Sequence, residues 1–213
     1  MVAKTGALAR QYQKGNVAED LLEVAARILE TERVEDLSVR RLTREVGVTP
    51  ANFYNHYPSL NDLLLTLGAR EFRARARYLA HVRRTSKTKA EAVRRAAASY
   101  IDLASTKSQL FRIMFGLIPD AQHHNDFWSA SDESMAQVVE IVYGEPIYDP
   151  TDLYASRERC KVAYGLVALS YGLARMTIDG AVPFSPERRA ELRHFVEGVI
   201  DAFITGELAR LLA

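Results

Sequence analysis

Between residues 38 and 57 the sequence has room for only two short helices separated by a tight turn. Ser38 is a suitable N-cap for the first of them, and apolar residues then recur with the helical period. Gly47 ends that helix, because glycine readily adopts the left-handed conformation that a helix terminus requires. Thr49 caps the second helix and places Pro50 at its first position, where proline's missing N–H costs nothing. The pattern predicts a helix-turn-helix, whose second helix can enter the major groove of DNA.

The second helix of this pair is expected to bury one face and present the other to DNA. Leu42, Val46, Val48 and Phe53 have the spacing to pack inward. Side chains on the free face suit different parts of a duplex: adenine edges for the two amides, thymine methyl groups for the small residues, and phosphates for the hydroxyl and imidazole groups. The two amides are Asn52 and Asn55, the small residues are Pro50 and Ala51, and the hydroxyl and imidazole groups belong to Thr49, Tyr54 and His56. Arg40, near the start of the first helix of the pair, is suited to a guanine edge or a phosphate.

The rest of the chain predicts helices throughout. Glycine (11) and proline (7) are sparse, and no alternating strand pattern occurs. Asn16 is expected to cap a first helix that runs to about Glu32, and Ser59 a fourth that continues into an arginine-rich stretch. Longer amphipathic helices are expected at about 88–105, 107–117, 125–143, 152–180 and 186–211. We therefore expect an all-α fold of about nine helices, with a three-helix head and a larger helical body.

Composition excludes several classes of protein. No run of about 18 apolar residues is long enough for a membrane helix, and the polar N-terminus lacks the apolar core of a signal peptide. The single cysteine, Cys160, has no partner within the chain for a disulfide, so we expect a cytoplasmic location. Net charge is only +1, but residues 1–15 are basic, and so is the stretch 70–95. These segments can attract phosphates, although the second can equally be a solvated helix face.

The first 65 or so residues resemble the TetR family of transcriptional regulators. The motifs that carry the resemblance are Gly47-Val48-Thr49, Phe53-Tyr54-Asn55-His56-Tyr57, Leu63-Leu64 and the lead-in Tyr12-Gln13-Lys14-Gly15-Asn16. The resemblance implies positions near bases and near phosphates. Near bases these are Arg40, Pro50, Ala51, Asn52, Tyr54 and Asn55; near phosphates they are Ser38, Thr49, Tyr54 and His56. The family usually has lysines where this chain has Pro58 and Leu60, so Lys14, Arg10 or Arg44 is expected to compensate.

The body is similar to the effector domain of one TetR subgroup, through Leu110–Phe115, Tyr164–Ala174 and Asp179-Gly180. The implied organisation is a basic arm (1–15), a helix-turn-helix domain (16–62) and a ligand-binding and dimerisation domain (63–213). The candidate ligand residues are mainly aromatic and sulfur-containing, and each can instead fill the core. They are Tyr100, Phe111, Met114, Phe115, Phe127, Trp128, Tyr164, Tyr171 and Met176, with Arg112, Arg175, His123 and His124 as polar anchors.

The last two helices are the expected dimer interface. Gly165, Ala168, Gly172 and Ala174 permit close helix approach, and residues 192–204 carry an apolar stripe too wide for one exposed helix. The interface residues we expect are Ala168, Gly172, Phe195, Val199 and Phe203. The stripe can instead belong to the core of one chain.

These patterns together predict a ligand-responsive repressor that binds a pseudo-palindromic operator as a homodimer and is released by a small apolar or aromatic effector. We expect no cofactor, no metal and no membrane partner. Adjacent His123 and His124 chelate poorly, and Cys160 suits a small buried position. The sequence contains no phosphate loop, nucleophile elbow or paired-carboxylate motif, so we expect no enzymatic activity. The alternatives are an activator, an effector-independent DNA-binding protein or an all-α enzyme.

Overall fold

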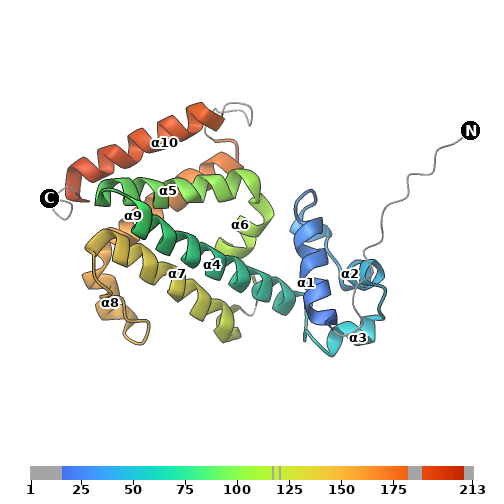
Figure 1. Cartoon of the computed structure of the whole chain (residues 1–213). Coiled ribbons are helices and arrows are strands. Elements are labelled where there is room, and N and C mark those ends of the chain that lie inside the picture. The colour runs from blue at the N-terminus through green and yellow to red at the C-terminus, as the bar shows by residue number, and fades with distance from the viewer. Residues whose placement is uncertain (1–15, 117, 120, 182–188, 209–213) are drawn as a thin grey trace, which may run out of the picture. The chain divides into compact units, whose positions relative to one another are not determined.

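The computed structural model describes residues 16–116, 118, 119, 121–181 and 189–208, and divides into two compact units, Met1–Leu63 and Leu64–Ala213 (Figure 1). Within these residues every regular element is a helix, which confirms the all-α class. There are ten α-helices among them, one more than expected. Lys14 and Arg10 lie outside the described residues.

The first unit is a three-helix head. Its elements are α1 (Val17–Ile28), a short 3-10 turn (Val34–Asp36), α2 (Val39–Val46) and α3 (Pro50–Tyr54). Each helix contributes fully buried side chains to one core, among them Leu21 of α1, Leu42 of α2 and Phe53 of α3. Burying such side chains is the main source of stability in a unit this small.

The second unit is the helical body. Helix α4 (Leu60–Thr85) begins in the first unit and continues into the second, so one helix belongs to both. The body then contains α5 (Lys89–Thr106), α6 (Ser108–Phe115), α7 (Asn125–Tyr143), α8 (Leu153–Arg159), α9 (Lys161–Ile178) and α10 (Arg189–Phe203).

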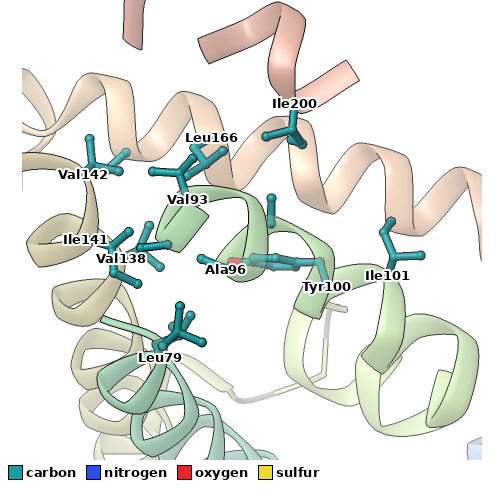
Figure 2. Close-up of a cluster of buried hydrophobic side chains, with 14 of the residues drawn as sticks. Leu79, Val93, Ala96, Tyr100, Ile101, Val138, Ile141, Val142, Leu166 and Ile200 are labelled. Atoms are coloured by element: carbon teal, nitrogen blue, oxygen red, sulfur yellow. The ribbon is translucent and has the colours of Figure 1, made fainter. Parts of the chain in front are cut away.

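Helix α5 lies at the centre of the body, where it packs against α6, α7, α9 and α10. Figure 2 shows its residues Val93, Ala96 and Tyr100 among side chains from α4, α7, α9 and α10. Leu166 of α9 and Ile200 of α10 are almost fully buried in this cluster. The core therefore fixes one side of α9 and one side of α10 and leaves their other sides free for a different role.

Three predicted helices have different bounds in the structure. Helix α1 ends at Ile28, not near Glu32, and Asn16 precedes it without a side-chain capping bond. The helix expected over 152–180 is two helices, because Cys160 leaves helical geometry (φ −104, ψ 17) and α9 begins anew after it. Apolar periodicity continues across that break, so it gave no signal of it. The last expected helix ends at Phe203 and passes into a π-helical turn, Ile204–Leu208.

The basic stretch 70–95 is partly neutralised within the body. Arg73 pairs with Asp126, Arg83 with Glu140, Arg94 with Asp201 and Arg95 with Glu91. These pairs favour the interpretation that the stretch is a solvated helix face over the interpretation that it attracts phosphates.

None of the described helices is long and apolar enough to cross a bilayer.

Candidate nucleic-acid interface and ligand cavity

The turn between α2 and α3 has the local geometry that the sequence predicts. Ser38 caps α2 by accepting a hydrogen bond from the Arg41 backbone N–H (3.3 Å). Gly47 adopts the left-handed conformation (φ 82, ψ 30), and its N–H donates to the Thr43 carbonyl. Thr49 then caps α3 by accepting from the Asn52 N–H (3.3 Å), with Pro50 at the first helical position. Short-range bonds alone therefore set where α3 begins.

Two longer-range contacts hold α3 against the rest of the head. The Tyr57 hydroxyl donates to the Ala18 carbonyl of α1 (3.0 Å). Phe53 is fully buried, with the Tyr57 ring 5.8 Å from its own. A one-turn helix such as α3 has little stability of its own. Its position therefore depends on these packing contacts.

Helix α2 is fixed to the segment after α1 by a bidentate ion pair. Both terminal nitrogens of Arg41 donate to the carboxylate of Glu32. This hydrogen bonding holds the pKa of Glu32 below its ordinary value and raises the pKa of Arg41. A second pair, Arg27 with Glu45 (3.5 Å), joins α1 to α2.

The predicted DNA-facing residues lie mostly on the surface of the head. Tyr54 is 57% exposed, although its ring edge packs on Phe53. The other exposed members of the set are Ser38, Arg40, Thr49, Pro50, Ala51, Asn55 and His56. The sequence has no acidic residue between Glu45 and Asp62, so residues 46–61 add no negative charge that would repel phosphates.

Asn52 differs from its neighbours because it is only half-buried rather than exposed. Its side-chain carbonyl oxygen is covered and has no hydrogen-bond partner in the described structure. A covered acceptor without a donor costs free energy, and that cost falls when a donor is supplied. The amide would have to turn outward for its oxygen to accept from a base edge.

The body contains a cavity of about 560 Å³ between α4, α6, α7, α8 and α9. One group of lining residues is apolar, and it consists of Leu65, Phe72, Met114, Phe115, Ile118, Ala121, Phe127, Trp128, Met135 and Val167. The polar group comprises Gln122, Ser131, Asp132, Tyr148, Arg157 and Tyr164. Ligand sites in proteins share this character, with apolar walls and a few polar groups that orient the ligand.

Five of the proposed ligand residues line this cavity: Met114, Phe115, Phe127, Trp128 and Tyr164. The remaining candidates do not. Tyr100 is buried in the core beneath the Arg75 guanidinium (3.8 Å to the ring centroid), and Phe111 stacks on Tyr171 (5.8 Å). Arg175 pairs with Asp179, and Met176 is 45% exposed.

The polar anchors expected beside these residues also lie elsewhere. His124 caps α7, its Nδ1 accepting from the Phe127 N–H (3.1 Å), and His123 is exposed. Arg112 is half-buried on α6, outside the cavity lining. The polar groups that do line the cavity come instead from the turn before α7, from α7, α8 and the segment between them, and from α9.

One hydrogen bond organises the polar part of the cavity. The Tyr148 hydroxyl donates to Oδ1 of Asp132 (2.6 Å). Desolvation, and then the hydrogen bond to the Asp132 carboxylate, raise the pKa of Tyr148. The phenol therefore keeps its proton at physiological pH and serves as the donor to the Asp132 side chain.

The apolar stripe of α10 is divided between two faces. Leu192, Val196, Ile200 and Ile204 are buried against the body. Phe195 (42% exposed) and Val199 instead line an open hollow with Ala190, Glu191, His194, Gly198 and Ala202. On α9, Ala168 is exposed and Gly172 half-buried. Phe203 is half-buried and reaches α9, because a Cβ on Gly165 would lie 3.5 Å from its ring.

Several residues of both sites were not identified from the sequence. The Glu32–Arg41 pair spans nine positions and has no local signature. Leu65, Phe72, Asp132, Tyr148 and Arg157 line the cavity from separate helices and a loop. The only sequence signal for Leu65 and Phe72 was their position on the apolar face of α4, which indicates packing and not a cavity.

No protein-family model matches the chain. Its fold is similar to that of several solved structures over nearly its whole length. A protein of unknown function from Rhodococcus sp. RHA1 has 24% identity and a TM-score of 0.71, covering 92% of this chain and 98% of that one. A TetR transcriptional regulator from the same organism has 12% identity and a TM-score of 0.62 (92% and 100%). A TetR-family transcriptional regulator from Streptomyces coelicolor has 24% identity and a TM-score of 0.58 (88% and 96%). The chain therefore has the all-α fold of TetR regulators.

Proposed function

We propose that the protein is a ligand-responsive transcriptional regulator that acts as a repressor. Its first unit reads a pseudo-palindromic operator through α3, and its second unit binds a small effector and a second copy of the chain. The observation that carries the proposal is the surface of α3, where small and amide side chains and an exposed tyrosine stand on a rigidly braced helix. Such side chains read base edges, whereas acidic groups, absent from residues 46–61, would oppose DNA binding.

The proposed base contacts come from Arg40, Pro50, Ala51, Asn52, Tyr54 and Asn55, and the proposed phosphate contacts from Lys14, Ser38, Thr49, Tyr54 and His56. One α3 covers only part of a groove, so useful affinity requires two copies. The exposed apolar surfaces of α9 and α10 support a dimer through Ala168, Gly172, Phe195, Val199 and Phe203. A pair of helices from each protomer would bury both surfaces in a four-helix interface.

The cavity in the second unit is the proposed effector site, and Phe127 is the proposed link to α4. Phe127 lines the cavity, packs edge-to-face against Phe72 of α4 (5.4 Å between ring centroids) and approaches Gly68 so closely that a Cβ there would lie 2.8 Å from its ring. A ligand that displaces this ring must also displace α4, which begins in the first unit. A ligand that binds the displaced form better releases DNA by that difference in affinity.

Selection from a pool of random duplexes tests the regulator proposal with the full chain. We expect enrichment of an inverted repeat whose half-sites lie about one helical turn apart, or a multiple of it, because a two-fold dimer presents two recognition helices. Enrichment of no sequence, or only of charge-dependent binding lost at moderate salt, would contradict it.

The direction of regulation is tested by placing the selected site over a promoter that drives a reporter. A repressor lowers transcription when the protein is expressed, and a cavity ligand restores it. Raised transcription on expression would make the protein an activator, and transcription that no cavity ligand alters would make it independent of an effector.

A further inference from the structure

The lining of the cavity includes one carboxylate, Asp132, that forms no ion pair with the residues that the structure describes. Among the described residues no Lys, Arg or His lies within ion-pair distance of Asp132, whose described hydrogen bond comes from the neutral hydroxyl of Tyr148. One donor occupies one of the two carboxylate oxygens, and the other oxygen remains an acceptor. Because its surroundings are less polar than water, this half-buried side chain attracts a positive charge more strongly than a fully exposed carboxylate would.

The surroundings of this carboxylate are aromatic. Phe72, Phe115 and Phe127 form a cluster with ring centroids 5.4 Å apart in the Phe72–Phe115 and Phe72–Phe127 pairs. Trp128 continues it, its ring 5.3 Å from that of Phe127, and Tyr164 also lines the cavity. The faces of aromatic rings attract cations, and the attraction strengthens where water is excluded.

The cavity also contains one basic residue, Arg157, which opposes a cation. Its side chain is exposed, so water and salt screen its charge, whereas Asp132 is half-buried in a less polar setting where charges interact more strongly. The carboxylate therefore dominates the electrostatic preference inside the cavity. Because its side chain is exposed, we assign Arg157 to the solvent-facing rim of the cavity.

We propose that the cavity binds an amphipathic organic cation, with an apolar or aromatic body among the rings and an ammonium-type head against Asp132. The inference rests on the proposed role of this cavity as the effector site. It names the effector's chemical class, and it requires no covalent step.

Trp128 provides the readout, because it lines the cavity and is the chain's only tryptophan. Three probes carry a phenylalkyl body and differ chiefly in the head: 4-phenylbutyltrimethylammonium, its neutral isostere with carbon in place of nitrogen, and 4-phenylbutyrate. Titration followed by tryptophan emission, and repeated by calorimetry, is expected to show the cation binding about tenfold more tightly than the isostere. The carboxylate probe is expected to bind most weakly.

Substitutions test whether the Asp132 side chain causes the preference for the cationic probe. Asp132→Asn keeps an acceptor for Tyr148 and should abolish the tenfold preference, whereas Glu133→Gln, the same charge change on an exposed neighbour of α7, should keep it. Tyr148→Phe removes the donor and leaves the charge, so the preference should persist there. This variant tests the proposal even if Asp132→Asn folds poorly.

The outcomes separate this proposal from the proposed function. Equal affinity for the three probes, or tightest binding of 4-phenylbutyrate with loss in Arg157→Gln, would overturn the cationic class and leave the effector site in place. Absence of any binding would overturn both the ligand class and the effector site. The DNA selection above, which needs no ligand, tests the regulator itself.

Discussion

Gly47 holds a backbone conformation that other residues adopt only at a cost. Its φ is 82, and a Cβ there would meet no atom within 4 Å, so the penalty for adding one is backbone strain alone. Gly47→Ala is expected to lower the free energy of unfolding by about 1–2 kcal/mol in chemical denaturation. Gly47→Asn should cost less, since asparagine tolerates the left-handed region. Equal losses for the two variants would show that strain is not the cause.

Glu32 makes the stability of the head depend on pH. Arg41 holds its pKa below the ordinary value of about 4.5, so the folded state binds the proton less readily than the unfolded state. The pair's contribution is therefore fully present above the ordinary pKa and is lost as pH falls through the folded value. Wild type should exceed Glu32→Gln in stability at neutral pH, and the gap should close in acid. The same pH-dependent gap in Glu23→Gln, an exposed carboxylate of α1, would refute the assignment.

For single residues, the sequence predicted the structure correctly wherever the interaction joins residues that are close together in the chain. The caps at Ser38 and Thr49 and the left-handed Gly47 were predicted because each bond joins residues a few positions apart. The half-burial of Asn52 was not predicted, because it depends on how α3 packs on the other helices of the head. The Asp132–Tyr148 bond was missed for the same reason, since it joins α7 to a loop.

Among the helices, α4 is in close contact with the Phe127 ring of α7 at Gly68. A Cβ there would lie 2.8 Å from Cε2 of Phe127 and 3.2 Å from Cγ2 of Ile113. Alanine favours a helix more than glycine by about 1 kcal/mol, but overpacking costs about 1–3 kcal/mol. Because Phe72 and Trp128 flank the Phe127 ring, we expect overpacking to win and Gly68→Ala to unfold at lower denaturant.

A double mutant isolates this contact. In a Phe127→Leu background the ring edge is gone, and Gly68→Ala should then be neutral or stabilising. An undiminished penalty in that background would place the cause elsewhere in α4.

Helix bounds were predicted best where a cap or a glycine ends the element, as at Gly144 after α7. They were predicted worst where apolar periodicity runs through a break. Cys160 is fully buried and continues the apolar pattern of the helices on either side of it. The pattern therefore predicts one continuous helix and gives no sign of the break. Burial also raises the pKa of its thiol, which favours the protonated, unreactive form.

For the whole molecule, the test of assembly is Phe195. Its ring is 42% exposed on the side of α10 that faces away from the core. Phe195→Glu should yield monomers in sedimentation and weaken operator binding, because a charge is costly in an apolar interface. Leu192→Glu on the core side should instead unfold the body. A Phe195→Glu protein that remains dimeric would contradict the proposed interface.

For the whole molecule, the sequence predicted the fold class correctly, but it identified only some of the residues that line the cavity. Any amphipathic aromatic can face a core or a cavity, and only tertiary packing decides between them. Tyr100 and Phe111 therefore proved to be core residues, while Leu65 and Phe72 proved to be cavity walls.

The central claim is that α3 reads DNA sequence, and a mobility shift on the selected operator tests it most directly. Wild type and Tyr54→Ala are compared at physiological salt against excess random DNA, with Tyr78→Ala, the same truncation at an exposed tyrosine of the body, as control. We predict that Tyr54→Ala costs about 1–3 kcal/mol of specific binding, a loss of roughly 5- to 150-fold, while Tyr78→Ala binds as wild type does. Equal affinity of all three proteins for operator and random DNA would contradict the claim.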